Sequence, residues 1–113
     1  MALLAAAPRS AASETWGPWA TITSHNGVDF RVCCESTETD GKYMWRVQFR
    51  SRYTEDVGFD FRITRPGDRP RSFSGRVVIK PGRTEEGWNM VAVRPGGTVD
   101  VWTKNWKFGR DAE

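Results

Sequence analysis

One stretch of the sequence, residues 43 to 53 (YMWRVQFRSRY), alternates without interruption between two sets of side chains. One set is mostly aromatic or aliphatic: Tyr43, Trp45, Val47, Phe49, Ser51 and Tyr53. The other set is mostly polar and basic: Met44, Arg46, Gln48, Arg50 and Arg52. A period of two over eleven residues is typical of a long antiparallel strand with one buried face. The stretch therefore predicts a sheet whose other strands pack around it.

Six further segments of the chain carry a strand pattern and are separated by turn residues. The expected strands are residues 16–23, 28–35, 57–64, 71–80, 88–94 and 98–108. The expected turns contain Asn26-Gly27, Asp40-Gly41, the segment 65–70, Pro81-Gly82 and Pro95-Gly96-Gly97. Short strands at regular spacing without a helical period are typical of an all-β sandwich or barrel. We expect a seven-stranded antiparallel β-sandwich, and a seven-stranded β-barrel is the alternative that fits the same spacing.

The pattern over residues 16–108 resembles immunoglobulin-like and fibronectin type III-like β-sandwich modules. The likeness rests on Trp45 in the third strand, on Ile79-Lys80-Pro81-Gly82 before the sixth, and on the turn at Pro95-Gly96-Gly97. The cysteine pair that joins the two sheets of antibody domains is missing. The resemblance implies a topology in which the sixth and seventh strands flank the third. It implies no function, because such sandwiches host many unrelated ones.

The domain organisation follows from the ends of the pattern. Residues 1–15 are rich in alanine and are expected to be a flexible tail, a linker or the remnant of a secretory signal. Residues 16–108 are expected to form a single domain, followed by a frayed C-terminus at 109–113. The signal-like run favours a secreted or periplasmic protein, with the cytoplasm as the alternative. No stretch approaches the roughly 20 apolar residues of a membrane span.

The two cysteines, Cys33 and Cys34, are neighbours in the sequence. A framework of several disulfides is therefore excluded. On a strand, the two side chains point to opposite faces. We expect free thiols, with Cys34 on the inner face and Cys33 pointing outward, where it is open to oxidation or cross-linking.

Catalytic and metal-binding groups do not converge in this sequence. The one histidine, His25, lies beside a turn, where we expect it to be exposed. His25 and Cys33 lack a third orienting group, and together with Cys34 they do not supply the four ligands of a zinc site. We expect no enzyme activity, no cofactor and no metal.

The outward set of the central strand is the candidate binding surface. Arg46, Gln48, Arg50 and Arg52 belong to this strand, and we expect Asp60 and Arg62 on a neighbouring strand, which leaves an excess of positive charge. If Val99 and Val101 face the core, the tryptophans of the last strand lie outside beside the arginines; if the tryptophans face the core, this surface is lost. The candidate binding residues are Arg46, Gln48, Arg50, Arg52, Arg62, Trp102, Lys104 and Trp106. Trp16 and Trp19 are expected to pack in the core or over a sheet edge.

Arginine and tryptophan dominate the hot spots of interfaces. We therefore expect a non-catalytic binding or interaction module that binds a protein or a carbohydrate through this Arg/Trp sheet face. The alternatives are a structural piece of an extracellular or envelope assembly, or a nucleic-acid-binding domain. The net charge is only +3, with 14 acidic residues, which disfavours nucleic acid as the partner. The sequence leaves the oligomeric state open.

Overall fold

A computed structural model describes residues 15–73 and 75–113 of the chain. All but one of the residues in the expected N-terminal tail lie outside this described part. The strands are β1 (Ala20–Thr21), β2 (Val28–Thr39), β3 (Lys42–Ser51), β4 (Val57–Thr64), β5 (Gly75–Ile79), β6 (Thr84–Val91) and β7 (Asp100–Phe108). A short 3-10 helix, η1 (Gly109–Asp111), ends the described elements.

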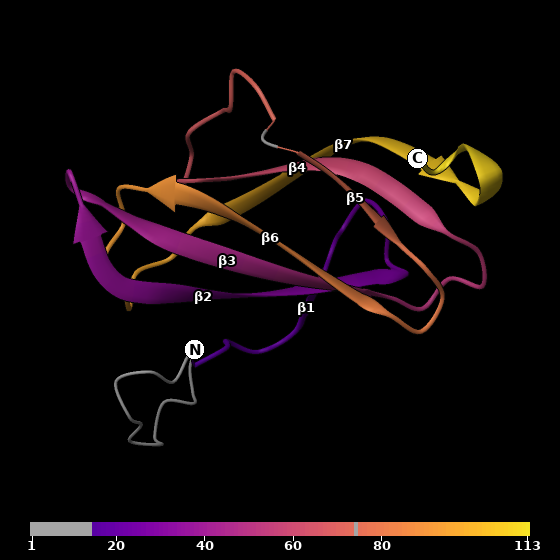
Figure 1. The fold of residues 1–113 in the computed structure, drawn as a ribbon, viewed down its shortest axis with the longest axis horizontal. Helices are drawn as coiled ribbons and strands as arrows, with labels where there is room; N and C mark the ends of the chain where they lie inside the picture. The colour runs from indigo at the N-terminus through magenta and orange to yellow at the C-terminus, as the bar shows by residue number, and fades with distance from the viewer. Residues whose placement is uncertain (1–14, 74) are drawn as a thin grey trace.

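The seven strands form two antiparallel sheets, with the orders β1-β2-β3-β6 and β5-β4-β7 (Figure 1). The prediction of a seven-stranded all-β protein in two sheets is confirmed, and the described strands do not close into a barrel. β3 lies between β2 and β6, whereas β7 pairs with β4 in the other sheet. The expectation that β7 flanks β3 was therefore wrong. The order also differs from that of constant-type immunoglobulin domains, which place the third strand in the sheet of three.

The core lies between the two sheets and is built from the apolar set of each strand. In β3, Trp45, Val47 and Phe49 are buried, as the alternation predicts. The buried side chains that they face come mainly from β4 and β5: Val57, Phe59, Phe61, Ile63, Val77 and Ile79. The ring of Phe49 packs edge-on against Phe59, with 4.9 Å between centroids. Burying this aromatic set is the main stabilising term of the fold.

The indole of Trp45 is buried and also hydrogen-bonded, because its Nε1 donates to the carbonyl of Val93 at 2.8 Å.

Gly87 of β6 lies close to the ring of Phe61 in the core. A Cβ at this position would lie 2.2 Å from the ring of Phe61. The ring of Phe61 from the other sheet thus packs into the space left by the missing Cβ of Gly87.

A β-bulge in β7 changes which side chains of this strand face the core. Between Gly58 and Asp60 β4 advances two residues, but β7 advances three between its paired residues Lys104 and Lys107. Asn105 lies within this bulge, and its φ of 58° is in the left-handed region that asparagine tolerates. The bulge shifts the alternation by one residue, so the two ends of β7 expose opposite sets.

The turns follow the predicted chemistry with one exception. Asp40 and Gly41 both have positive φ, as a two-residue hairpin between β2 and β3 requires. Asn26 and Gly27 were expected to form a similar turn, but neither has positive φ, and the loop spans residues 22–27. Gly27 is needed for space instead, since a Cβ there would lie 2.5 Å from the ring of Tyr53.

Two expected boundaries were also wrong. β6 begins at Thr84, four residues before the expected start at residue 88, because its first residues pair along the edge of β3 with their polar side chains exposed. The C-terminus was expected to fray, but Ala112 is buried and its carbonyl accepts two hydrogen bonds from the guanidinium of Arg76. A Cβ on Gly58 would lie 1.9 Å from that carbonyl oxygen, so the last residues pack directly on β4.

Candidate binding face: a ladder of tryptophan and arginine

The candidate site is the outer face of the four-stranded sheet. Side chains of directly paired residues share a face of a sheet. The pairing therefore places Arg31, Gln48 and Glu86 in one row across β2, β3 and β6. Cys33, Arg46 and Trp88 form the next row, and Met44 and Met90 a further one.

Two tryptophans from the segment before β1 cover part of this face. The segment is held along β2 by a hydrogen bond from the amide of Gly17 to the carbonyl of Val32 at 2.9 Å, and by the pairing of Ala20 with Phe30. Trp16 and Trp19 thus pack over the sheet near its edge, which is one of the two placements expected for them. The structure brings them to the arginines of the neighbouring strands.

The result is an alternating stack, which we call the ladder, made of Arg46, Trp16, Arg31, Trp19 and Arg50 in that order. The distances from guanidinium carbon to ring centroid along the ladder are 5.5, 5.2, 4.5 and 4.1 Å. Each contact lies within the range of a cation–π interaction, worth about 0.5–1 kcal/mol at exposed sites. The ladder therefore fixes three arginines whose side chains are usually mobile.

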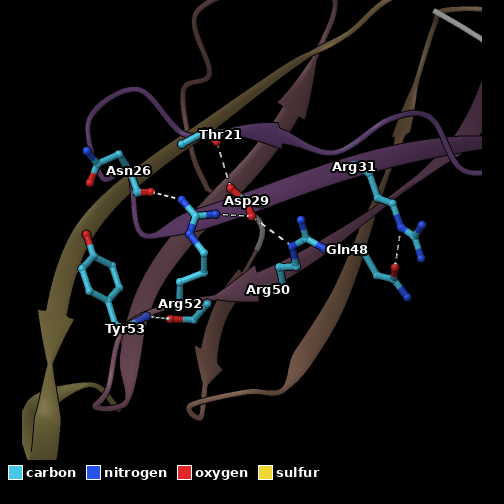
Figure 2. Close-up of polar contacts among 9 residues, drawn as sticks. Thr21, Asn26, Asp29, Arg31, Gln48, Arg50, Arg52 and Tyr53 are labelled. Carbon is cyan, nitrogen blue, oxygen red and sulfur yellow. Dashed lines mark hydrogen bonds and ion pairs between the residues drawn. The ribbon is translucent and has the colours of Figure 1, made fainter.

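Asp29 neutralises two arginines at one end of this face (Figure 2). Its side chain is only 4% exposed and accepts hydrogen bonds from Thr21 Oγ1 and Arg50 Nε, both at 2.9 Å, and from Arg52 Nη1. Arg52 also donates to the carbonyl of Asn26. Burial disfavours the charged form of Asp29, but the bonds from Arg52, Arg50 and Thr21 outweigh it and hold the pKa below its ordinary value.

A second polar network crosses the middle of the face. Glu86 of β6 accepts hydrogen bonds from Arg46 at 2.6 Å and from Gln48 at 3.0 Å. The bond from Arg46 is the main reason why the pKa of Glu86 lies below its ordinary value. Gln48 in turn accepts from Arg31 Nε at 2.8 Å, and Arg46 also lies 3.7 Å from Glu35.

The charge of the face is therefore nearly balanced. Four arginines, 31, 46, 50 and 52, share it with three carboxylates, Asp29, Glu35 and Glu86. The excess of positive charge is smaller than the sequence predicted, because Asp29, Glu35 and Glu86 from β2 and β6 compensate the arginines, while Asp60 belongs to the other sheet. A single net positive charge remains.

Three of the predicted site residues lie on the opposite side of the protein. Arg62 and Trp102 are paired across β4 and β7, and Lys104 is paired with Asp60 in the same sheet. Trp102 Nε1 donates to Thr64 Oγ1 at 2.9 Å. The prediction that Arg62, Trp102 and Lys104 join the arginines of β3 was wrong, because β4 and β7 form the second sheet.

Trp106, the last predicted site residue, packs between the sheets. The bulge at Asn105 turns it inward, where its ring lies 4.2 Å from the Phe59 ring and stacks on His25 at 3.7 Å with a 7° interplanar angle. The prediction that Trp106 is exposed beside Trp102 was therefore wrong. His25 was expected to be exposed, but it is half-buried, and this burial lowers its pKa.

The structure thus brings together Arg46, Gln48, Arg50 and Arg52 and adds residues that sequence reasoning missed. The most exposed of these is Trp88, which is 54% exposed on the edge strand β6. Met44 and Met90 are paired beside it and are half-buried. The alternation of Glu86, Trp88 and Met90 was the available signal, but the expected strand began only at residue 88.

The two cysteines face opposite sides, as expected, and both are free thiols. Cys34 packs against the core, whereas Cys33 lies on the ladder face. Cys33 is nevertheless only 4% exposed. The ring of Trp16 contacts Arg31 and Arg46, which are the neighbours of Cys33 along β2 and across to β3, and we infer that this ring covers the thiol. Burial raises the pKa of Cys33 to about 12, so the expected oxidation-prone thiol is protected.

Residues 15–73 and 75–113 contain no group of histidine, cysteine, aspartate and glutamate side chains that could hold a metal ion. Within these same ranges, no helix has the length and apolar character that a membrane crossing requires. A scan against protein-family models and searches of curated proteins and of solved structures found no match to this chain.

Proposed function

We propose that this chain is a non-catalytic interaction module that binds a protein partner through the β6 side of the ladder face. The observation that carries the proposal is Trp88. A tryptophan that is more than half exposed leaves a large apolar area in water, and such residues are the commonest anchors of protein interfaces. Its place on an edge strand makes it accessible to a partner approaching the sheet from the side or from above.

The neighbours of Trp88 support a protein partner. We call Met44, Arg46, Glu86, Trp88 and Met90 the interaction patch. Tryptophan, methionine and arginine are enriched in the buried centres of interfaces, and methionine adapts its shape to the partner. The pair of Arg46 and Glu86 is already formed and gives the patch a polar border without an unpaired charge.

A carbohydrate partner is the nearest alternative, since an exposed indole can also stack on a sugar ring. The flanking methionines favour protein, because a sugar site needs polar groups that are free to bind hydroxyls, while those of Gln48 and Glu86 already bond to each other. Nucleic acid is disfavoured by the near balance of charge on the face. A structural role in an envelope or extracellular assembly would use the same patch.

We also propose a distant relationship to immunoglobulin-like modules and a location outside the cytoplasm. A relationship to immunoglobulin-like modules is supported by the two antiparallel sheets and opposed by the strand order. A secreted or periplasmic location is supported by the alanine-rich N-terminal residues. Neither is needed for the proposed interaction.

The test compares the unmodified chain with Trp88→Ala and with Arg62→Ala, a control on the outer face of the other sheet. Immobilised samples of all three would be used for capture from an extract of the source cells, and each captured protein would then be purified and titrated calorimetrically. We expect Trp88→Ala to weaken binding by about 2 kcal/mol or more, or roughly thirtyfold, and the control to bind normally.

Three results would contradict the proposal. Equal affinity of the Trp88→Ala variant for the purified partner would show that the patch is not the contact surface. Binding to a neutral glycan array that is lost in Trp88→Ala, together with no protein partner, would assign the patch to carbohydrate. A steep loss of affinity with salt would instead indicate a polyanion.

A further inference from the structure

We propose that Arg31, held between Trp16 and Trp19, is a binding site for a carboxylate on an acidic side chain of the partner protein. This inference rests on the proposed function and names the chemistry that the partner must present. Arg31 is the one arginine of the ladder face that has no acidic partner within the described part of the chain.

The guanidinium of Arg31 is held in place by three neighbours. The rings of Trp16 and Trp19 lie 5.2 and 4.5 Å from its central carbon. Its Nε donates to Gln48 Oε1 at 2.8 Å, and Gln48 is in turn bonded to Glu86. Stacking and this hydrogen bond already fix the Arg31 side chain. Binding a ligand therefore costs little additional side-chain entropy.

The terminal nitrogens of Arg31 are left for a ligand. In Figure 2 the guanidinium of Arg31 lies apart from the cluster around Asp29, and only its Nε is joined to Gln48. No hydrogen bond joins the terminal nitrogens to another residue of the described ranges. A planar guanidinium presents two parallel N–H groups, which match the two oxygens of a carboxylate. The tryptophan rings shield the site partly from water, which strengthens such a pair.

The surroundings favour a single carboxylate over a dense polyanion. Glu86 is close enough for the charge of Arg31 to contribute to lowering its pKa, but its oxygens already bond to Arg46 and Gln48. The one net positive charge of the face accommodates one added negative charge. Further negative charges would lie near Glu86, Asp29 and Glu35, which repel them.

Arg31 is also positioned to act together with the interaction patch. It lies in the row that continues through Gln48 to Glu86 of β6. Neighbouring strands are about 4.8 Å apart, so Arg31 lies roughly 10 Å from the strand of Trp88. A contact of ordinary size, about 800 Å² per partner, covers both.

The test is an NMR titration of the whole chain with an acetylated, amidated Gly-Glu-Gly-Glu-Gly peptide and with its glutamine twin. The side-chain Nε signals of Arg31 and the Nε1 signals of Trp16 and Trp19 are followed. We expect these signals to move with the glutamate peptide and not with the twin. Arg31→Gln should weaken the response about tenfold or more, and Arg62→Gln should not change it.

A second variant separates loss of the site from loss of the fold. Arg31→Lys keeps the charge and the contact with the rings but lacks the two parallel N–H groups. We expect a folded protein with a response between those of the unmodified chain and Arg31→Gln. An unchanged response in either Arg31 variant, or an equal response to the glutamine twin, overturns the proposal. So does a response to glucuronate or inorganic phosphate without one to the glutamate peptide.

The outcomes also keep the two proposals apart. The response of Trp16, Trp19 and Arg31 to the glutamate peptide should persist in Trp88→Ala. If Trp88→Ala loses the protein partner but the peptide gives no response, the interaction patch stands and the carboxylate site is wrong. If the peptide binds at Arg31 but Trp88→Ala keeps full affinity for the partner, the carboxylate site stands and the patch is wrong.

Discussion

Replacing Trp16 with alanine should make the thiol of Cys33 reactive. The Trp16 ring contacts Arg31 and Arg46, the two neighbours of Cys33 on this face, and we infer that it covers the thiol. The substitution removes both cation–π contacts, which together are worth about 1–2 kcal/mol. If the thiol reacts through local opening of this cover, the opening becomes about 5–30 times more frequent.

The removal of the cover adds a second effect through the pKa of the thiol. Burial raises the pKa of Cys33 from 9.0 to about 12, so at pH 8 only about one thiol in ten thousand is ionised. A hydrated thiol near its ordinary pKa would be ionised about one time in ten. The thiolate is the reactive form, and alkylation should therefore accelerate by between about tenfold and a thousandfold.

The rate of iodoacetamide labelling at pH 8, followed by mass spectrometry, measures this directly. All samples should carry Cys34→Ala so that only Cys33 is labelled, with circular dichroism confirming that each variant is folded. Trp102→Ala, in the other sheet, is the matched control and should label as slowly as the parent. Equal labelling rates for Trp16→Ala and the parent would refute the placement of the Trp16 ring over Cys33.

Three further changes have defined consequences for stability, each measured by urea unfolding. Asn105→Val puts a β-branched residue at positive φ and removes the 2.7 Å bond from Asn105 Nδ2 to Asp60, and should cost about 2–3 kcal/mol; Asn105→Gly, which keeps the backbone conformation, should cost less. Gly87→Ala should cost about 1–3 kcal/mol by crowding Phe61, and combining it with Phe61→Leu should recover part of the loss. Burial lowers the pKa of His25 in the folded chain, so the unfolded chain takes up the proton first as the pH falls. The stability that neutral His25 contributes is therefore fully present above pH 6.5 and is lost as the pH falls from there through the folded pKa. His25→Phe should make the free energy of unfolding less dependent on pH in this range. An equal pH slope in parent and His25→Phe would show that His25 is not its source.

Local patterns predicted the parts of the fold that depend on neighbours in the sequence. The alternation in β3 placed Trp45, Val47 and Phe49 in the core, because a half-buried strand displays its burial with a period of two. The turn at Asp40-Gly41 was also predicted correctly, because a two-residue hairpin turn requires residue types that tolerate positive φ.

The parts that were missed depend on contacts between distant segments. Asn105 looks like any polar residue in a strand, and its bulge becomes visible only when β7 is aligned with β4. The start of β6 was missed because Thr84 and Glu85 are exposed and polar. They belong to the strand through their backbone pairing with β3, and no buried apolar side chain marks them in the sequence. The sequence placed Arg46 and Gln48 on one face because they share one strand. The expected position of Arg62, Trp102 and Lys104 beside them was wrong because it depends on which strands are neighbours.

The bulge at Asn105 has a consequence for how β7 tolerates change. Trp102 and Trp106 are four residues apart, a spacing that puts two side chains on the same side of an unbroken strand. Here Trp102 lies on the outer face of the sheet, whereas Trp106 packs, partly buried, against the core between the sheets. Deleting a single residue between them would move one of the two tryptophans to the opposite face of the sheet, whereas most substitutions would leave both in place. Length is therefore more constrained than identity at this point of the chain.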